Sequence, residues 1–220
     1  MDKEAVKNEF LELVDSIERE GFDKDGLIRY LTKKSDFFDA PATSKYSKSY
    51  QGGLAEHSLN AYKALCNIVE RFSPEEYSPD TLKIVGLLYD ISKANFYEEY
   101  SRNVKGDDGV WRQVKSYKTR EDDDRFIYGS HEQTSEFMVR TFVPLTVEES
   151  VAILHHLGGQ GFDSTQTNIA TVYSRYPLAL FLHIADMIDT FVGVIEKKPA
   201  EQDESNEGEE PEIGDDAPNE

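Results

Sequence analysis

The strongest structural signal in this chain is the stretch Ser78-Pro-Asp-Thr-Leu-Lys-Ile-Val-Gly-Leu-Leu-Tyr-Asp90. A serine followed by a proline is typical of a helix start, because the serine hydroxyl accepts from a free backbone N–H group and the proline fits the first turn. The apolar run before Tyr89 predicts that this helix, expected from about Asp80 to Lys93, is buried at the centre of the fold. Asp90 follows the run directly, and a buried carboxylate is costly without a partner. A metal ion is the simplest partner that we infer.

Capped and amphipathic segments on both sides of this helix predict a mainly helical protein. Apolar residues recur at helical spacing in these segments, and capping residues mark several starts, as Thr146 and Glu149 do in a capping box. The other expected helices lie at about residues 5–20, 23–31, 54–72, 130–141, 146–157, 166–175 and 177–196. A loop rich in Ser, Lys and Tyr, from Asp39 to Gly53, leads into the third of them.

The segment from Tyr97 to Arg120 has a different pattern. Turn residues from Gly106 to Gly109 separate two short β-prone pieces, which predicts a β-hairpin with its tip at that turn. The expected fold class is therefore all-α, with one small β-hairpin inserted after the central helix. We expect three parts in the chain: N-terminal helices packed on the core in residues 1–35, the main domain in residues 36–198, and a disordered acidic tail in residues 199–220.

Charge separates the tail from the rest of the chain. Residues 199–220 contain ten acidic residues and no Lys or Arg, so this segment cannot bury enough apolar surface to offset its conformational entropy. The formal net charge of the chain is −19, and removing the ten charges of the tail leaves −9. An acidic body argues against broad, nonspecific nucleic-acid binding. No apolar run approaches the ~20 residues of a membrane span and no signal peptide is evident, so we expect a cytoplasmic protein without membrane association.

Five histidines, all between residues 57 and 183, predict a metal site gathered by the fold. They are His57, His131, His155, His156 and His183. Imidazole nitrogen is a common ligand of transition metals, and carboxylates add charge and can bridge two ions. His155 and His156 point about 100° apart on a helix, so only one of them is expected to be a primary ligand. Asp186 shares a helical face with His183, and its neighbour Asp189 is expected to be exposed.

The order of these residues resembles the HD-domain superfamily of metal-dependent phosphohydrolases, which fold as helical bundles. The resemblance extends from Asp36 to Val192 and rests on five short motifs that occur in the family's order. They are His57 in Gly52-Gly-Leu-Ala-Glu-His-Ser58, Asp90 in Leu87-Leu-Tyr-Asp-Ile-Ser-Lys93, His131, His156 and Asp186. The chain looks most similar to small stand-alone HD proteins of bacteria and phages, and it is also similar to the HD domain of bacterial 3′–5′ exoribonucleases.

The resemblance implies a set of metal ligands. By analogy with the family, His57, Asp90 and Asp186 would bind a first ion, and Asp90 would bridge to a second ion held by His131 and His156. Of the remaining histidines, His155 is the rival of His156, and His183 is expected to support the ligands from outside. The implied cofactor is one or two divalent ions of Mn, Fe, Ni or Mg.

One residue departs from the family's pattern. The name-giving His-Asp pair is Tyr89-Asp90 here, and in the family the histidine of that pair binds the first metal. A phenol titrates near ~10, so tyrosine is a poor ligand for Mg²⁺, Mn²⁺ or Ni²⁺ at neutral pH, whereas ferric iron can accept a phenolate. Three interpretations follow: water replaces the lost ligand, Tyr89 binds iron, or the site is degraded and the protein binds without hydrolysing.

The resemblance also implies an activity, the hydrolysis of a phosphomonoester or phosphodiester on a nucleotide or at the end of a nucleic acid such as RNA. Asp90 is the expected central catalytic residue because it would contact both ions, and Lys93 would approach the substrate phosphate. Arg102 and Lys105, on the predicted hairpin, are candidates for phosphate binding. The alternatives are a catalytically weakened HD-fold protein that binds a nucleotide or a protein partner, and a protein with a structural metal and no turnover.

Overall fold

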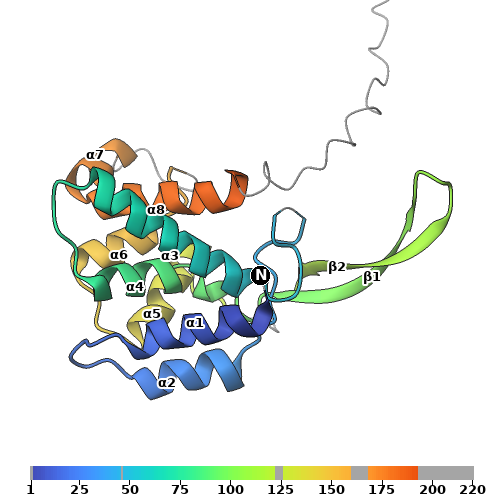
Figure 1. Cartoon of the computed structure of the whole chain (residues 1–220), viewed down its shortest axis with the longest axis horizontal. Helices are drawn as coiled ribbons and strands as arrows, with labels where there is room; N and C mark the ends of the chain where they lie inside the picture. Colours follow the sequence, from blue (N-terminus) through green and yellow to red (C-terminus); the bar gives the residue numbers. More distant parts are fainter. Residues whose placement is uncertain (1, 46, 122–125, 160–167, 193–220) are drawn as a thin grey trace, which may run out of the picture.

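The computed structural model describes residues 2–45, 47–121, 126–159 and 168–192. Most of these residues are helical, and the helices form one body from which a β-hairpin projects (Figure 1). The α-helices are α1 (Lys3–Asp15), α2 (Lys24–Arg29), α3 (Gly53–Phe72), α4 (Pro79–Leu88), α5 (His131–Arg140), α6 (Val147–Leu154), α7 (Ile169–Arg175) and α8 (Pro177–Met187). Short helices of other types are η1 (Tyr30–Lys34), η2 (Ile91–Lys93) and η4 (Ile188–Val192).

The hairpin overturns the expected all-α class. Strands β1 (Tyr97–Lys105) and β2 (Trp111–Thr119) pair antiparallel along their whole length, from Tyr97 opposite Thr119 to Lys105 opposite Trp111. The chain is therefore mostly helical with a small two-stranded sheet. The turn lies where the sequence predicts it, and Gly109 adopts a φ of 75° that glycine tolerates. The class was wrong because a ladder of nine residues in each strand is a regular element of the fold.

Helix α4 begins as its sequence predicts and ends earlier. The Ser78 hydroxyl accepts from the backbone N–H of Thr81, and the residues from Ile84 to Leu88 are all buried. The α-helix ends there instead of continuing to Lys93, and Asp90 leaves helical geometry with a φ of −107° and a ψ of 16°. The three residues of η2 then turn the chain. Asp90 thus lies at the junction of two helical segments rather than inside one.

Helix α3 is the long element against which α1, α4 and α8 pack. Gly86 of α4 permits a close approach, because a Cβ atom there would lie 2.8 Å from the backbone of α3. At the start of α3, a Cβ atom on Gly53 would lie 2.2 Å from the carbonyl oxygen of Lys48. Glycine at this position therefore lets the loop before α3 fold against the N-terminal end of that helix, close to His57.

The N-terminal helices share the hydrophobic core of the body. The ring of Phe10, in α1, has its centroid 5.1 Å from that of Phe37 and 5.6 Å from that of Phe38. Arg19, which follows α1, donates to the buried carboxylate of Glu149 in α6 at 2.7 Å. These contacts attach both the start of the chain and α6 to the same core.

The remaining predicted helices are present with shifted bounds. Helices α5 and α6 begin after the caps Ser130 and Thr146, and the capping box of Thr146 with Glu149 is present. The predicted helices at 166–175 and 177–196 correspond to α7 and to α8 with η4, and their outer residues lie outside the described ranges. The acidic tail, residues 199–220, lies outside them as well. Among the described residues, no helix combines the length and the apolar character that a membrane crossing requires.

Candidate metal centre

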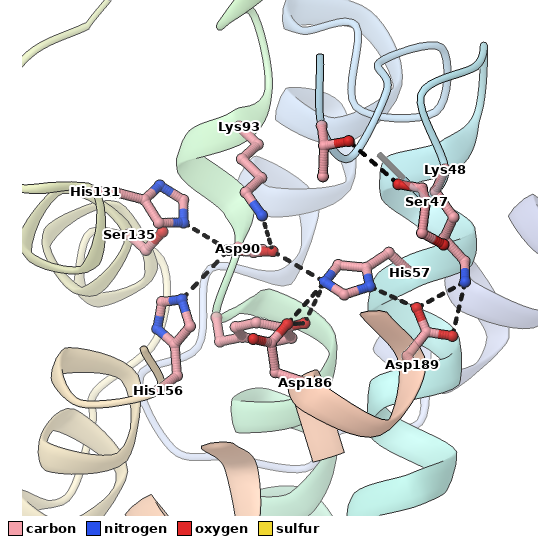
Figure 2. A network of polar contacts seen from close by, with 12 residues as sticks. Ser47, Lys48, His57, Asp90, Lys93, His131, Ser135, His156, Asp186 and Asp189 are labelled. Atoms are coloured by element: carbon pink, nitrogen blue, oxygen red, sulfur yellow. Dashed lines mark hydrogen bonds and ion pairs between the residues drawn. The ribbon is translucent and has the colours of Figure 1, made fainter. Parts of the chain in front are cut away.

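Asp90 lies, fully buried, between two groups of side chains that could each hold a metal ion (Figure 2). His131 and His156 form one group with it, which we call the His131/His156 side. His57 and Asp186 form the other, the His57/Asp186 side. In each group, one ligand atom from every residue lies within 4.8 Å of the others. The fold thus brings together the five residues on which the family resemblance rests, and Asp90 belongs to both groups.

The His131/His156 side is built from the start of α5 and the end of α6. His131 is the first residue of α5, directly after the Ser130 cap, and His156 follows the last residue of α6 by two. The Nε2 atom of His131 lies 2.6 Å from Oδ1 of Asp90, and Nε2 of His156 lies 3.5 Å from the same oxygen. One carboxylate oxygen therefore faces both imidazoles, and His156 rather than His155 is the member of the group.

The tautomer of His156 directs a lone pair into the centre. Its Nδ1 lies 2.7 Å from the carbonyl oxygen of Ile153 and donates a proton to it, since a carbonyl can only accept. In the neutral ring Nε2 then carries a lone pair. This atom is buried and has no hydrogen-bond partner among the described residues. A lone pair that faces a carboxylate oxygen across 3.5 Å fits a cation between the two, so the residues present suit a metal ion.

Ser92 holds His131 from outside the centre. The Ser92 oxygen lies 2.6 Å from Nδ1 of His131, and its hydroxyl donates to the backbone carbonyl of His131 at 3.2 Å. Ser135 in turn donates to Ser92 at 2.8 Å. Burial lowers the pKa of His131 by more than its hydrogen bond to Asp90 raises it. The ring is therefore neutral near pH 7, as a metal ligand must be.

The His57/Asp186 side is closed by hydrogen bonds. The Nε2 atom of His57 lies 3.0 Å from Oδ1 of Asp186 and 3.3 Å from Oδ2 of Asp90. The phenol oxygen of Tyr89, which is fully buried, lies 2.8 Å from the same nitrogen and donates to Oδ1 of Asp186 at 3.0 Å. Burial raises the pKa of Tyr89 well above its usual value, and the two carboxylates raise it further. The phenol therefore keeps its proton.

Lys93 neutralises the second oxygen of Asp90. Its ammonium lies 2.6 Å from Oδ2 of Asp90, three residues earlier in the chain. Burial alone would raise the pKa of Asp90, but Lys93, together with His131 and His57, holds it well below its usual range. Burial likewise lowers the pKa of Lys93, and the carboxylates of Asp90 and Asp186 more than reverse this. Both members of the pair are therefore charged.

Asp189 is buried, which corrects the expectation that it is exposed. It lies on η4 with 7% of its surface exposed, and its carboxylate is 2.6 Å from Nδ1 of His57. The Lys48 ammonium contacts both of its oxygens, at 2.8 and 2.7 Å, and Asn60 donates to one at 2.8 Å. Burial lowers the pKa of His57, but its hydrogen bonds to carboxylates outweigh this and raise it to about 10. Through Lys48, His57 and Asn60, the network ties the loop before α3 to η4 across the N-terminal half of α3.

Sequence reasoning missed Lys48, Asn60 and Asp189 as residues of the site. The available signal was that Asp189 follows Asp186 by three residues, so a helix places both on one face. The pairing with Lys48 joins residues 141 positions apart, and no local pattern indicates it. Lys48 also adopts a φ of 60°, which is uncommon outside glycine and is visible only in the folded chain.

Four other candidates from the sequence lie outside both groups. His155 is the C-cap of α6. His183 donates from Nδ1 to the backbone carbonyl of His156 at 2.6 Å, so it supports the segment that carries this ligand. Arg102 and Lys105 lie on β1, in the hairpin that projects from the body (Figure 1). The structure therefore does not bring these two basic residues to the centre.

A pocket of about 320 Å³ lies beside the His57/Asp186 side. Its wall includes the polar residues His57, Lys93 and Asp186 and the apolar residues Leu157 and Phe191. Lys93 therefore contacts both the central carboxylate and the pocket. A small anionic ligand in this pocket would meet the ammonium of Lys93 next to the metal ligands.

The donor atoms of the centre define its chemistry. Imidazole nitrogens and a shared, ionised carboxylate form a ligand set that suits divalent transition metals. Beside them lie a lysine and a pocket that a small molecule can enter. No protein-family model, curated protein or solved structure matches the chain.

Proposed function

We propose that the protein is a metal-dependent phosphohydrolase of the HD-domain superfamily, acting on a phosphorylated nucleotide or on a nucleic-acid end such as that of RNA. One observation carries the proposal. A fully buried carboxylate, Asp90, is shared by two donor groups that contain three histidines and a second aspartate. A structural ion needs one closed ligand set, whereas a carboxylate shared between two groups beside a pocket is the arrangement of a catalytic centre.

The residues of the chain have separate tasks in this proposal. Asp90, His131 and His156 would hold the metal, with divalent Mn, Fe, Ni or Mg as the candidates, and His57 and Asp186 line the pocket beside them. A bound divalent ion neutralises phosphate charge and activates water for attack on phosphorus. Lys93 lies between the centre and the pocket, where its ammonium can bind a phosphoryl oxygen.

The size of the pocket bounds the substrate. Its volume of about 320 Å³ is at the lower end of the range of about 300–1,000 Å³ typical of ligand sites. It therefore suits a phosphorylated small molecule, a mononucleotide or one terminal nucleotide of a chain. Phe191, a residue that is 58% exposed, offers an aromatic ring on which a base can stack.

The proposal is tested with a substrate panel. The purified full chain is loaded separately with Mn²⁺, Fe²⁺, Ni²⁺ and Mg²⁺ and assayed for phosphate release from nitrophenyl esters, nucleoside phosphates, cyclic dinucleotides and RNA with defined ends. We expect hydrolysis of at least one phosphoester that a chelator stops and re-added metal restores. Lack of hydrolysis with every metal and every substrate would contradict the proposal.

A specific observation favours the alternative of a weakened enzyme that binds a nucleotide or a protein partner. Tyr89 occupies the position of a family histidine and hydrogen-bonds with Asp186 instead of offering a ligand lone pair. The variant Tyr89→His separates the two functions. A large gain of hydrolysis in the variant would identify the natural protein as a weakened enzyme, whereas a loss would place Tyr89 in a working site.

A further inference from the structure

We propose that this chain holds a single metal ion, on the His131/His156 side of Asp90, and that the His57/Asp186 side holds none. The inference rests on the proposed function in one respect, that the centre binds metal. It departs from the two-ion arrangement that the family resemblance implies. Three features carry it: a nitrogen without a partner on one side, a phenol on the other, and a lysine on the shared carboxylate.

On the His131/His156 side, the donor atoms are arranged for an ion. His156 directs a buried lone pair toward Oδ1 of Asp90, and no described residue donates to that nitrogen. Both imidazoles have their outer nitrogen fixed, His156 by the carbonyl of Ile153 and His131 by Ser92. Two oriented imidazoles and one carboxylate oxygen make three protein ligands, which leaves positions open for water or substrate, as in catalytic sites.

On the His131/His156 side, one hydrogen bond joins His131 to Asp90 at 2.6 Å and His156 has none within the group. On the His57/Asp186 side, His57, Asp186 and Tyr89 are all in polar contact with one another. The histidine of the family would offer a lone pair at position 89, whereas Tyr89 donates its proton to Asp186. The phenol oxygen also lies 2.8 Å from Nε2 of His57, so it contacts two of the atoms that would have to bind an ion on this side. The phenol cannot easily swing away, because its ring is buried between His57, at 5.9 Å between centroids, and His156, at 4.9 Å.

Lys93 adds a charge argument to the geometry. Its ammonium contacts Oδ2 of Asp90, which is the oxygen that faces His57. The other oxygen, Oδ1, faces the imidazoles of His131 and His156. Each oxygen of Asp90 thus serves one side, and on the His57/Asp186 side the cation is provided by the protein. A divalent ion there would be repelled by this ammonium.

The first test is the stoichiometry of bound manganese. The full chain is reconstituted with Mn²⁺, separated from free metal by gel filtration, and examined by elemental mass spectrometry and electron paramagnetic resonance. We expect about one ion per chain, as three good ligands on one side imply, and the spectrum of isolated Mn²⁺. Two ions per chain, an exchange-coupled pair spectrum, or no bound ion would each overturn the proposal.

Position 89 gives a matched pair of variants. Tyr89→His supplies the missing lone pair, so bound manganese should rise from about one ion to about two. Tyr89→Phe keeps a ring of similar size and supplies no ligand, so its content should stay at about one ion. If Tyr89→His stays at the content of the natural protein, Tyr89 is not what keeps the second ion out and the proposal fails.

A second pair of variants assigns the ion to its side. His156→Ala should weaken Mn²⁺ binding by at least about 100-fold, more than the loss of a supporting partner usually costs. His57→Gln retains a polar side chain for Asp189 and should change the affinity little. Circular dichroism and thermal melting establish that each variant folds. If a variant does not fold, the proposal of a single ion is tested by the electron paramagnetic resonance spectrum of the natural protein with Mn²⁺. The reverse order of affinities would overturn the assignment.

These measurements do not require turnover, so they separate this inference from the proposed function. A protein that binds one manganese ion through His131 and His156 but hydrolyses nothing would retain the inference and fail as a hydrolase. An active hydrolase with two coupled ions would retain the function and fail the inference.

Discussion

The two sides of Asp90 contain the same residue types, but their polar atoms are satisfied in different ways. On the His131/His156 side, two oriented imidazoles face one carboxylate oxygen, and one buried nitrogen has no partner among the described residues. On the His57/Asp186 side, a phenol, an ammonium and the carboxylate of Asp189 complete the hydrogen bonds. Ligand residue types alone therefore do not identify a metal site. A metal site is identified by the buried donor atoms that lack a hydrogen-bond partner in the protein.

The strongest way to break the comparison is to remove the carboxylate that both sides share. Asp90→Asn keeps the shape of the side chain but loses its charge, so neither side retains an anionic bridging ligand. We expect metal content to fall to background and any hydrolysis to fall by more than about 100-fold, which is the upper cost of losing only a supporting partner. Elemental analysis and initial rates measure both. Asp25→Asn, an exposed carboxylate in α2, is the control. Retained metal in Asp90→Asn would show that Asp90 is not a ligand.

The next largest effect is a loss of folding stability without a loss of metal, which we expect on the His57/Asp186 side. In Asp189→Asn the buried Lys48 ammonium loses its anionic partner, so the free energy of unfolding should fall by roughly 3 kcal/mol. Metal content should stay unchanged, because this network supports His57 and not the imidazoles on the other side. Denaturant titration and metal analysis measure the two quantities.

The half-exposed pair of Glu9 and Lys63 provides the matched control for that variant. Glu9→Gln also removes the acid of an ion pair, but a pair at the surface contributes less than about 1 kcal/mol. If Asp189→Asn lowers metal affinity as well as stability, His57 is a ligand after all, and the contrast between the two sides disappears.

Much of the fold follows from local sequence signals. The Ser78 cap, the apolar run that ends at Leu88 and the glycine turn at Gly106–Gly109 predict the central helix and the hairpin, because each acts within a few residues of itself. The hairpin was therefore predicted, and the all-α class was wrong because it left out the small two-stranded sheet that this hairpin forms, with pairing from Tyr97–Thr119 to Lys105–Trp111.

The site also has a part that the sequence predicts and a part that it does not. The order of the histidines and aspartates, compared with the HD pattern, places five candidate ligands, and the structure brings these five together around Asp90. The partners that decide how each ligand is satisfied could not be predicted, because they come from distant positions. Tyr89 donates to Asp186, 97 residues later, and Asp189 binds Lys48 across 141 residues. Local periodicity contains no information about such contacts.

A smaller effect is expected from changing the residues that contact the outer nitrogen atoms of the histidines. Ser92→Ala removes the oxygen beside Nδ1 of His131, which fixes the orientation and tautomer of that ring. Affinity for Mn²⁺ should fall about 10- to 100-fold, the usual cost of losing such a partner. Asp189→Asn changes the corresponding partner of His57 and should leave the affinity unaltered. Equal losses in both variants, measured by titration with a fluorescent competitor for Mn²⁺, would mean that both sides hold metal.

The smallest expected effect concerns a third buried acid, Glu149, which resembles Asp90 in burial and differs from it in its partners. All of its contacts come from the protein itself, from two nitrogens of Arg19 at 2.7 and 3.1 Å, from Thr81 at 2.7 Å and from the backbone N–H of Thr146 at 2.8 Å. Glu149 belongs to neither donor group. The comparison therefore predicts that this acid stabilises the fold without any metal.

The pH dependence of stability tests that prediction. Burial raises the pKa of Glu149, but the hydrogen bond from Arg19 and the neighbouring donors lower it more, so the folded-state pKa lies below the unfolded value. The stabilisation is complete above the unfolded pKa of about 4.3 and is lost as the pH falls toward the folded pKa, by up to about 1.4 kcal/mol for each pH unit. In Glu149→Gln this part of the acid dependence should disappear while metal content stays the same. Urea midpoints measured from about pH 6 to about pH 3 compare the two proteins, and because the other carboxylates titrate in both, only the difference between the curves reports on Glu149. Parallel curves would show that its ion pair with Arg19 is not what satisfies it.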